Sequence, residues 1–136
     1  MNNIVITFGN FDLFHIGHLN ILKKAKSLGD YLVVGVSTDQ MSFLEKNKKT
    51  YIHENERAKI VSSLKCVDEV FLERSLEYKV KYIKKYQANV LVMGNDWENK
   101  FDWVKDYCDV EVVYLSRTPN VSTTSIKMKL PVLGGE

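Results

Sequence analysis

Cysteine and net charge are both scarce in this chain of 136 residues. The two cysteines carry no CxxC spacing and have apolar neighbours, so we expect two buried free thiols, as is usual in a reducing compartment. Lysine and arginine total 19 against 17 acidic residues, and the net charge of +2 gives no field that would by itself indicate nucleic-acid binding. We therefore expect no nucleic-acid partner, and any anion site must be local.

Long apolar runs are absent as well. No stretch approaches the roughly 20 apolar residues that span a bilayer, and the first residues lack the basic start and cleavage site of a signal peptide. We expect a cytoplasmic protein without membrane insertion. The length suits one hydrophobic core, which predicts a single domain over residues 1–130 and a flexible tail over 131–136.

Short apolar runs alternate with segments of helical spacing along the chain. The run IVITF at 4–8 has no polar alternation, which is typical of a strand buried on both faces of a parallel sheet. Helical spacing begins at Gly17. The repeated alternation predicts an α/β fold with βαβ units, right-handed crossovers and a five-stranded, mainly parallel sheet. Further strands are expected at 31–37, 67–72, 89–94 and 110–115, and further helices at 56–64, within 75–86 and from about Ser122.

The first strand ends directly before the sequence GNFDLFHIGH, residues 9–18. In such sheets ligands bind at the carboxyl ends of the strands, and a helix beginning there offers unpaired N–H groups and the positive end of its dipole to an anion. His15 and His18 are expected on one helical face, where each can donate a ring N–H to phosphate, while Gly17 allows close approach. The alternatives are imidazoles satisfied by local carbonyls, or a zinc pair, for which no recognised ligand spacing is present.

A second polar group, SRTPNVSTTSIK at 116–127, follows the last predicted strand. Ser122 is a natural N-cap, and capping alone would explain it. Arg117 is not explained in that way. A guanidinium, several hydroxyls and a second helix N-terminus together predict a polyphosphate cradle.

Lysines are concentrated in the segment 44–56, which we expect to be the longest irregular stretch. A run of lysines is most often a solvated loop. This one follows the second strand, so Lys46, Lys48 and Lys49 can close over the same crevice and stabilise charge that develops on phosphates.

Acidic and aromatic residues add candidates at the same edge of the sheet. Asp96, which follows the fourth strand, could hold a metal or an amino group, and Trp97 could stack on a ligand or pack in the core. Asp12 has two possible roles, turn formation and metal coordination, and the sequence does not distinguish them. No nucleophilic serine or cysteine accompanies these groups, so the set suits phosphoryl or nucleotidyl transfer by positioning and charge stabilisation.

These motifs together resemble the HxGH nucleotidyltransferase superfamily in its cytidylyltransferase branch, and more narrowly the bacterial glycerol-3-phosphate cytidylyltransferases. The resemblance rests on DLFHIGH, LGDYLVVGVSTD, VDEV, VMGNDWENKFD and VVYLSRTPNVSTT, over roughly residues 4–127. It implies a Rossmann-like three-layer sandwich and an enzyme that makes CDP-glycerol and pyrophosphate from CTP and sn-glycerol 3-phosphate, for teichoic-acid or capsule precursors. It also implies a divalent cation such as Mg²⁺ and a homodimer.

The resemblance implies roles for individual residues as well. His15 and His18 would stabilise the α-phosphoryl group during in-line attack, and Arg117 would hold the leaving phosphates. The expected catalytic residues are His15, His18, Lys46 and Arg117. The expected CTP-binding residues are Gly9, Asn10, Phe11, His15, Gly17, His18, Lys48, Gly94, Asp96, Arg117, Thr118, Ser122, Thr123 and Thr124. Lys46, Lys79 and Arg57 are expected to bind the acceptor, and Asp12 is the metal candidate.

Three positions depart from the usual pattern of that family: Asn10 stands where a threonine is common, Asn120 where a glycine is common, and Lys65 where an arginine is usual. Two other functions stay open. One is a cytidylyltransferase or adenylyltransferase for another phosphorylated alcohol or sugar, against which the segment GNDWENKFD argues. The other is a non-catalytic nucleotide-binding regulator.

Overall fold

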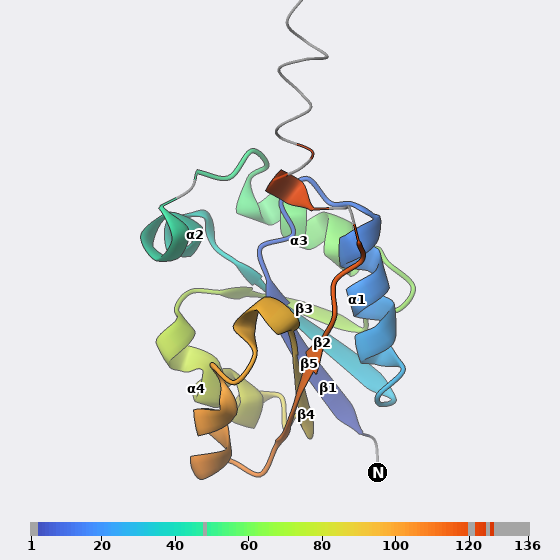
Figure 1. Cartoon of the computed structure of the whole chain (residues 1–136), viewed down its shortest axis with the longest axis vertical. Coiled ribbons are helices and arrows are strands. Elements are labelled where there is room, and N and C mark those ends of the chain that lie inside the picture. The colour runs from blue at the N-terminus through green and yellow to red at the C-terminus, as the bar shows by residue number, and fades with distance from the viewer. Residues whose placement is uncertain (1–2, 48, 120–121, 125, 127–136) are drawn as a thin grey trace, which may run out of the picture.

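The computed structural model describes residues 3–47, 49–119, 122–124 and 126. Five strands form one sheet with helices on both of its faces (Figure 1). The strands are β1 (Ile4–Gly9), β2 (Tyr31–Ser37), β3 (Glu69–Glu73), β4 (Val90–Gly94) and β5 (Glu111–Leu115). The α-helices are α1 (Ile16–Lys26), α2 (Asp39–Lys46), α3 (Glu54–Ser62) and α4 (Lys79–Lys85), and the 3-10 turns are η1 (Leu76–Tyr78), η2 (Asn95–Trp97) and η3 (Asp102–Asp106).

The sheet has the strand order β3-β2-β1-β4-β5, and each neighbouring pair is parallel. The chain builds outward from β1 to β3 on one side, then crosses back to place β4 and β5 on the other side. The order therefore switches between β1 and β4, as in a doubly wound nucleotide-binding fold. The Rossmann-like three-layer sandwich expected from the sequence is confirmed.

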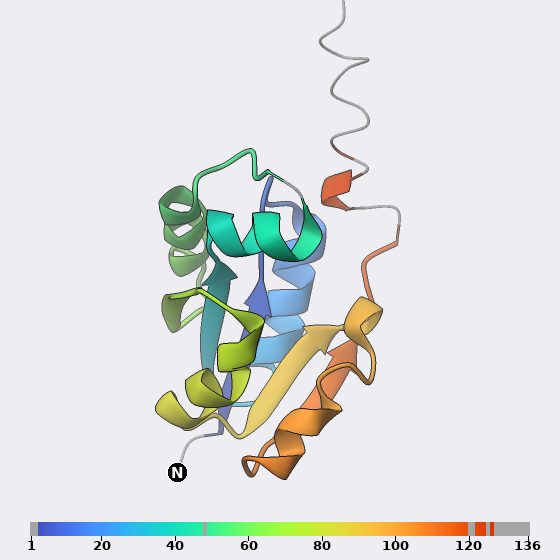
Figure 2. The same ribbon diagram turned by 90° about the vertical axis from the view of Figure 1, so that its left-hand side faces the viewer.

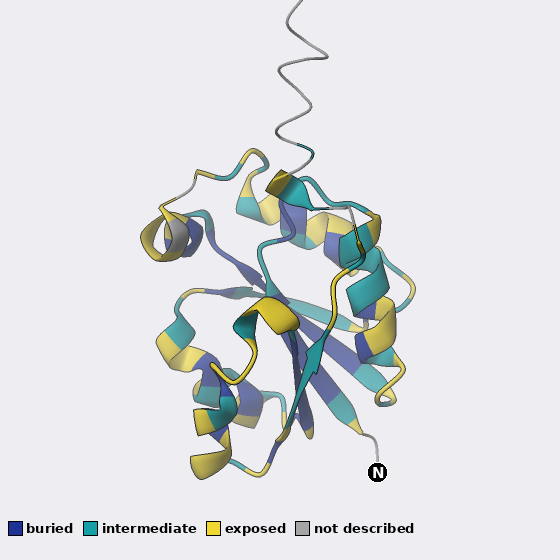
Figure 3. Cartoon of the chain, in the orientation of Figure 1, coloured by how far each residue is buried: buried dark blue, intermediate teal, exposed yellow. Residues whose placement is uncertain are grey.

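Side chains of the central strands alternate between two apolar cores because successive residues of a strand point to opposite faces. Val5 and Val34 belong to the core under α1 and α3. Ile6 and Leu91 belong to the core under α4 and η3. Burial is greatest along these strands, as Figure 3 shows, and Figure 2 shows α2 at the end of the sheet toward which the strands point.

Both cysteines are free thiols, as expected, but they are half-buried rather than fully buried. Cys66 packs at the edge of the first core and Cys108 at the edge of the second. Within the described part of the chain, no helix combines the length and the apolarity that a bilayer crossing needs. The expected tail, 131–136, lies outside the described residues, so the domain boundary stays a prediction.

All five strands predicted from the sequence are present; β2 has the predicted bounds, and the ends of the others differ by at most two residues. Helix α2 was missed, since its residues were assigned in part to an irregular lysine-rich loop. The helix begins after Thr38, whose hydroxyl oxygen accepts a hydrogen bond from Met41 N at 3.1 Å, and it ends at Asn47 with φ 53°. The sequence Thr-Asp is a recognisable N-terminal signal, but the short apolar pattern that follows does not distinguish a helix from a loop.

Candidate functional site

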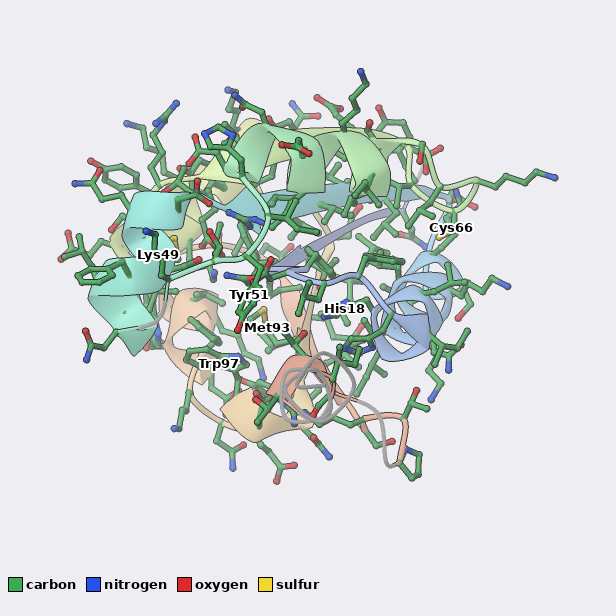
Figure 4. The ribbon with its side chains drawn as sticks, turned by 90° about the horizontal axis from the view of Figure 1, so that it is seen from above. His18, Lys49, Tyr51, Cys66, Met93 and Trp97 are labelled. Carbon is green, nitrogen blue, oxygen red and sulfur yellow. The ribbon has the colours of Figure 1, made fainter. Side chains whose placement is uncertain are left out.

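A cavity of about 290 Å³ opens where the strand order switches, at the carboxyl ends of β1 and β4. Figure 4 looks onto this end of the molecule, with His18 on the side of α1, Trp97 on the opposite side and Met93 between them. Thirteen of the fourteen expected CTP-binding residues line the cavity: Gly9, Asn10, Phe11, His15, Gly17, His18, Gly94, Asp96, Arg117, Thr118, Ser122, Thr123 and Thr124. The fourteenth, Lys48, lies outside the described residues.

The loop between β1 and α1 has an unusual backbone. Phe11 and Leu13 have φ angles of 57° and 51°, in the left-handed region that residues other than glycine seldom adopt. Asn10 stabilises the turn in two ways. Its Oδ1 accepts a hydrogen bond from Asp12 N at 2.8 Å, and its Nδ2 donates to Ser42 Oγ in α2 at 2.6 Å. The residue that departs from the family pattern therefore ties the loop to the neighbouring helix.

Asp12 is buried, and both of its carboxylate oxygens are engaged by backbone. Tyr51 N and Ile52 N donate to them at 2.8 and 2.9 Å. The Asp12 carbonyl oxygen also accepts a hydrogen bond from the Thr123 hydroxyl at 2.9 Å. Asp12 therefore connects three segments that surround the cavity.

His15 and His18 form a reciprocal cap at the start of α1. His15 Nδ1 accepts a hydrogen bond from Gly17 N at 3.0 Å, and His18 Nδ1 accepts one from His15 N at 3.2 Å. The two rings stack with centroids 3.8 Å apart, and Phe11 and Phe14 pack against the His18 ring. The sequence HxGH thus builds a rigid pair of imidazoles at a helix N-terminus.

The hydrogen bonds determine which ring nitrogens can act on a ligand. Because each Nδ1 accepts a backbone N–H, the proton of each neutral ring is on Nε2. Burial and the Arg117 guanidinium lower the pKa of His15, and burial, the His15 ring and Arg117 lower the pKa of His18 to about 3. Among the described side chains, His15 Nε2 is the buried polar atom that has no hydrogen-bond partner. At neutral pH both rings are therefore neutral and carry an Nε2–H donor. The donor of His15 is buried and lacks an acceptor among the described residues, so a ligand could supply one.

Arg117 lines the same cavity as the two histidines, and its side chain is 61% exposed. Its Nη2 lies 3.2 Å from Asp96 Oδ2, which is also exposed, so this ion pair is weak and easily exchanged for a phosphate. The Thr118 hydroxyl accepts a hydrogen bond from Asn20 Nδ2 of α1 at 2.9 Å. This contact brings the segment after β5 against the segment after β1.

The chain turns helical again after Ser122, as expected. Residues 123, 124 and 126 have helical conformation, and Ile126 N donates to Ser122 O at 3.1 Å. Ser122 and Thr123 also line the cavity. The hydroxyl residues of the second motif therefore lie at the same cavity as the histidines, from more than 100 residues away in the sequence.

Comparison with protein families adds a separate observation. The model of the family described as cytidylyltransferase-like matches residues 6–129. The chain belongs to the cytidylyltransferase-like family. The membership expected from the HxGH motif and its companions is confirmed.

Curated members of this family resemble the chain along nearly its whole length. A glycerol-3-phosphate cytidylyltransferase of Bacillus subtilis is 50% identical over 126 residues, covering 93% of this chain and 95% of that protein. The protein of the same name from Staphylococcus aureus is 44% identical and covers 93% of each chain. Among solved structures, a lipopolysaccharide core biosynthesis protein of Thermoplasma volcanium is 30% identical with a TM-score of 0.75, covering 87% of this chain and 99% of that one.

The lysine-rich segment of this cytidylyltransferase-like chain does fold over the cavity, as predicted for the loop after β2. Lys49 and Thr50 line the cavity, and the Thr50 hydroxyl donates to Asp39 Oδ1 at 2.8 Å. The backbone of Lys46 forms the last residue of α2. The Lys46 side chain and the whole of Lys48 lie outside the described part of the structure.

Arg57 is an expected acceptor residue, but it lines neither this cavity nor a smaller one beside Lys79. It is 1% exposed in α3. Its guanidinium donates to Asn10 O at 2.6 Å, Ser37 O at 2.8 Å and Ile52 O at 2.8 Å, and it pairs with Asp39 at 2.5 Å. Arg57 therefore joins the loops that follow β1 and β2 to the start of α3.

Lys79 lines a second cavity of about 50 Å³. It is 1% exposed, its Nζ forms an ion pair with Glu73, and the same Nζ lies 3.7 Å from the centre of the Phe8 ring. Burial lowers the pKa of Lys79, and burial raises the pKa of Glu73, while each charge opposes the shift of the other. Unlike the histidines, this expected acceptor residue reaches its cavity from the α4 side of the sheet.

The described residues do not build a dedicated metal site. Within them, no three His, Cys, Asp or Glu side chains lie close enough together to hold an ion. The carboxylate of Asp12 is engaged by two N–H groups, and Asp96 is the exposed acid at the cavity. Mg²⁺ often binds through one or two carboxylates, waters and substrate phosphates. Among the described residues, Asp96 is therefore the acid that could contribute to such a site beside a bound nucleotide.

Several polar residues at or beside the two cavities were missed from the sequence, among them Asn20, Ser42 and Glu73. Asn20 and Ser42 are polar contacts of the cavity wall, and Glu73 is the partner of Lys79. Glu73 is the last residue of the short strand β3, where an acidic side chain is usually expected to be exposed to solvent. Only the proximity of α4 reveals that it is buried. Asn20 carried no clear signal, because it lies two positions after His18 on α1 and residues at that spacing do not share a helix face.

Proposed function

We propose that this chain is a glycerol-3-phosphate cytidylyltransferase, which makes CDP-glycerol and pyrophosphate from CTP and sn-glycerol 3-phosphate. The curated relatives of that name support the substrate pair. The observation that carries the chemistry is the pair of neutral Nε2 donors at the start of α1, facing a cavity that Arg117 also lines. Such a site suits a negatively charged phosphate chain.

The reaction needs no covalent enzyme intermediate. An oxygen of the acceptor phosphate forms a bond to the α-phosphorus of CTP while the bond from that phosphorus to the oxygen bridging to the β-phosphate breaks. The electron pair of that bond leaves with pyrophosphate. Because the acceptor phosphate is already an anion, no side chain has to remove a proton, and the protein acts by positioning and electrostatic stabilisation.

His15 and His18 would stabilise the α-phosphoryl group in this step. Their Nε2–H groups donate to its non-bridging oxygens, and the N-terminus of α1 adds its positive dipole. The reciprocal cap holds both rings in place before the substrate binds, so little reorganisation is needed as charge develops.

Arg117 and the hydroxyls of Thr118, Ser122 and Thr123 would hold the β- and γ-phosphates. Arg117 would exchange Asp96 for phosphate on binding, which costs little because the pair is exposed. Lys49, which lines the cavity, would contact the triphosphate. Lys48 as a triphosphate contact and Lys46 as an acceptor contact remain predictions from the sequence. Mg²⁺, a homodimer, a cytoplasmic location and a role in teichoic-acid or capsule synthesis remain predictions.

The proposal is tested with purified protein, CTP, sn-glycerol 3-phosphate and Mg²⁺. We expect equal amounts of pyrophosphate and CDP-glycerol, measured by a coupled pyrophosphate assay and by ³¹P NMR. Reactions with ATP in place of CTP, or without the acceptor, are the controls. Turnover only with another nucleotide or a sugar phosphate would assign a sister activity, and CTP binding without turnover of any acceptor would indicate a regulator.

A further inference from the structure

Asn20 is a half-buried residue of α1 that lies beside the nucleotide cavity without lining it. It comes three positions after Gly17, so the two residues share one face of the helix. Side chains of a helix lean toward its N-terminus, which here is the end at the cavity, where Gly17 is part of the lining. The segment that follows β5 runs beside this helix (Figure 1). Asn20 is therefore placed to contact that segment.

A hydrogen bond joins Asn20 to the lining of the cavity. Its Nδ2 donates to Thr118 Oγ1 at 2.9 Å, and Thr118 lines the cavity directly after Arg117. A threonine hydroxyl has two lone pairs and one proton. Because Oγ1 accepts from the amide of Asn20, its own proton points away from that amide. The Thr118 hydroxyl can then donate to an acceptor in the cavity.

The same hydrogen bond helps to position Arg117. The guanidinium of Arg117 is paired with an exposed carboxylate at 3.2 Å, and an exposed pair contributes little to holding it in place. Backbone and neighbouring side chains must do more. Asn20 holds Thr118, the next residue, and the Thr123 hydroxyl donates to Asp12 O at 2.9 Å. Both anchors fix the second motif to the part of the chain that follows β1.

The direction of the hydrogen bond matters because a phosphate offers only acceptors at neutral pH. The β- and γ-phosphates of CTP, and the pyrophosphate that leaves, present oxygens to the protein. A hydroxyl stabilises them only if its proton is turned toward them. The amide of Asn20 turns it in that direction. A carboxylate at the same position would accept the proton, turn it away from the phosphates and add a negative charge.

We infer that Asn20 is a positioning residue for the leaving pyrophosphate, an inference that rests on the proposed function. Asn20 orients the Thr118 hydroxyl as a donor and holds Thr118, with Arg117 beside it, against α1. As the bond from the α-phosphorus to the bridging oxygen breaks, negative charge grows on the leaving group. A donor that is already oriented stabilises this charge without rearrangement. Asn20 itself does not line the cavity and acts through Thr118.

Two ligands separate the pyrophosphate end of the site from the nucleoside end. Pyrophosphate and CMP are each titrated into the purified protein with Mg²⁺ by isothermal calorimetry. We expect Asn20→Asp to weaken pyrophosphate binding about tenfold or more, since a donor to an anion is lost and a like charge is added. Asn20→Ala, which favours the helix, should weaken it about threefold. A merely structural role would also change CMP binding or the thermal midpoint, and we expect both to stay at wild-type values.

The variant Thr118→Val shows whether Asn20 acts through the hydroxyl. In that background Asn20→Ala should have no further effect on pyrophosphate binding, and Asn20→Asp should have only the effect of its charge. Asn55→Asp is the matched control, because Asn55 is an exposed residue of α3 outside the cavity. This control should bind pyrophosphate as the wild type does.

Three results would overturn the inference. The first is wild-type affinity for pyrophosphate in Asn20→Asp, which would mean that Asn20 accepts rather than donates. The second is an equal loss from Asn20→Ala with and without the Thr118 hydroxyl, and the third is a wild type that does not bind pyrophosphate. Failure of the proposed function is a separate result: CTP and glycerol 3-phosphate would give no CDP-glycerol, although the pyrophosphate affinities changed as expected.

Discussion

Two helix starts in this molecule use a histidine in the same way but in different surroundings. His15 Nδ1 accepts a backbone hydrogen bond at the start of α1, and His53 Nδ1 accepts one from Asn55 N at 3.2 Å at the start of α3. The other nitrogen differs. His15 Nε2 is buried without a partner among the described residues, whereas His53 is exposed, with Nε2 3.7 Å from Asp39. Helix capping is therefore common to both, and the position on the sheet decides which ring can serve a ligand.

Arg57 and Arg117 also differ in burial and in how many of their hydrogen-bonding groups already have partners. Arg57 of α3 is buried and is held by three carbonyl oxygens and Asp39, so its groups are committed to the fold. Arg117 is mostly exposed and faces the cavity, with an exposed acid as its partner. From residue type alone, both arginines would be predicted to bind a phosphate. Their contacts show that Arg57 stabilises the fold, whereas Arg117 is available to bind a ligand.

The sharpest way to break the histidine comparison is to replace each cap with asparagine. Asparagine retains a capping oxygen but removes the Nε2–H donor. We expect His15→Asn to lower kcat about 10²–10³-fold, the effect typical of one preorganised donor, with little change in the thermal midpoint. His53→Asn should keep full activity, as measured by pyrophosphate release. Near-normal kcat in His15→Asn would contradict the donor role.

The arginine comparison predicts opposite losses. Arg117→Gln should raise the KM for CTP by about tenfold or more, since hydrogen bonds to charged groups contribute about 1.5–3 kcal/mol, and should leave stability unchanged. Arg57→Gln should lower the free energy of unfolding by about 3 kcal/mol, because it leaves Asp39 and buried carbonyls without their partner. Steady-state kinetics and urea unfolding measure the two effects. An Arg117 variant that unfolds readily yet binds CTP normally would reverse the assignment.

The pH dependence of the free energy of unfolding tests the unusual environment of the histidine pair at α1. The folded-state pKa of His18, about 3, lies below the usual unfolded value of about 6.5. As the pH falls below 6.5 the unfolded chain therefore takes up the proton first, and stability decreases until the pH approaches 3. The difference in free energy of unfolding between wild type and His18→Gln should shrink from pH 7 to pH 4. A difference that stays constant would show that His18 titrates normally.

The smallest effect is expected at Asn10, which lies between the two regions and accepts a hydrogen bond from Arg57 through its carbonyl. Asn10→Thr introduces the residue common in the family. The threonine hydroxyl can still accept from Asp12 N but does not reach Ser42, so we expect a loss of about 1 kcal/mol in stability. The kcat should stay within about threefold of the wild type. A much larger fall in kcat would mean that Asn10 itself contacts the substrate.

The strands and most of the site could be predicted because their signals are local. Apolar runs without alternation indicate buried parallel strands, and the rule that ligands bind at the carboxyl ends places His15, His18 and Arg117 at one edge. Helix α2 could not be found in this way. Its sequence, DQMSFLEK, is short and has only a brief apolar pattern, and its first residue, Asp39, is held by an ion pair with Arg57 of α3.

By itself, the sequence determined the family, the order of the elements and the positions that meet at the cavity, because periodicity and motif spacing are properties of neighbouring residues. The tertiary structure decided which ring nitrogen of each histidine faces the ligand, and which cations are buried. Arg57 and Asn10 are 47 positions apart, and Glu73 and Lys79 meet only because α4 folds back across the end of β3. Burial depends on such contacts between segments, so a charged side chain cannot be assigned to solvent, substrate or core until the segments are packed.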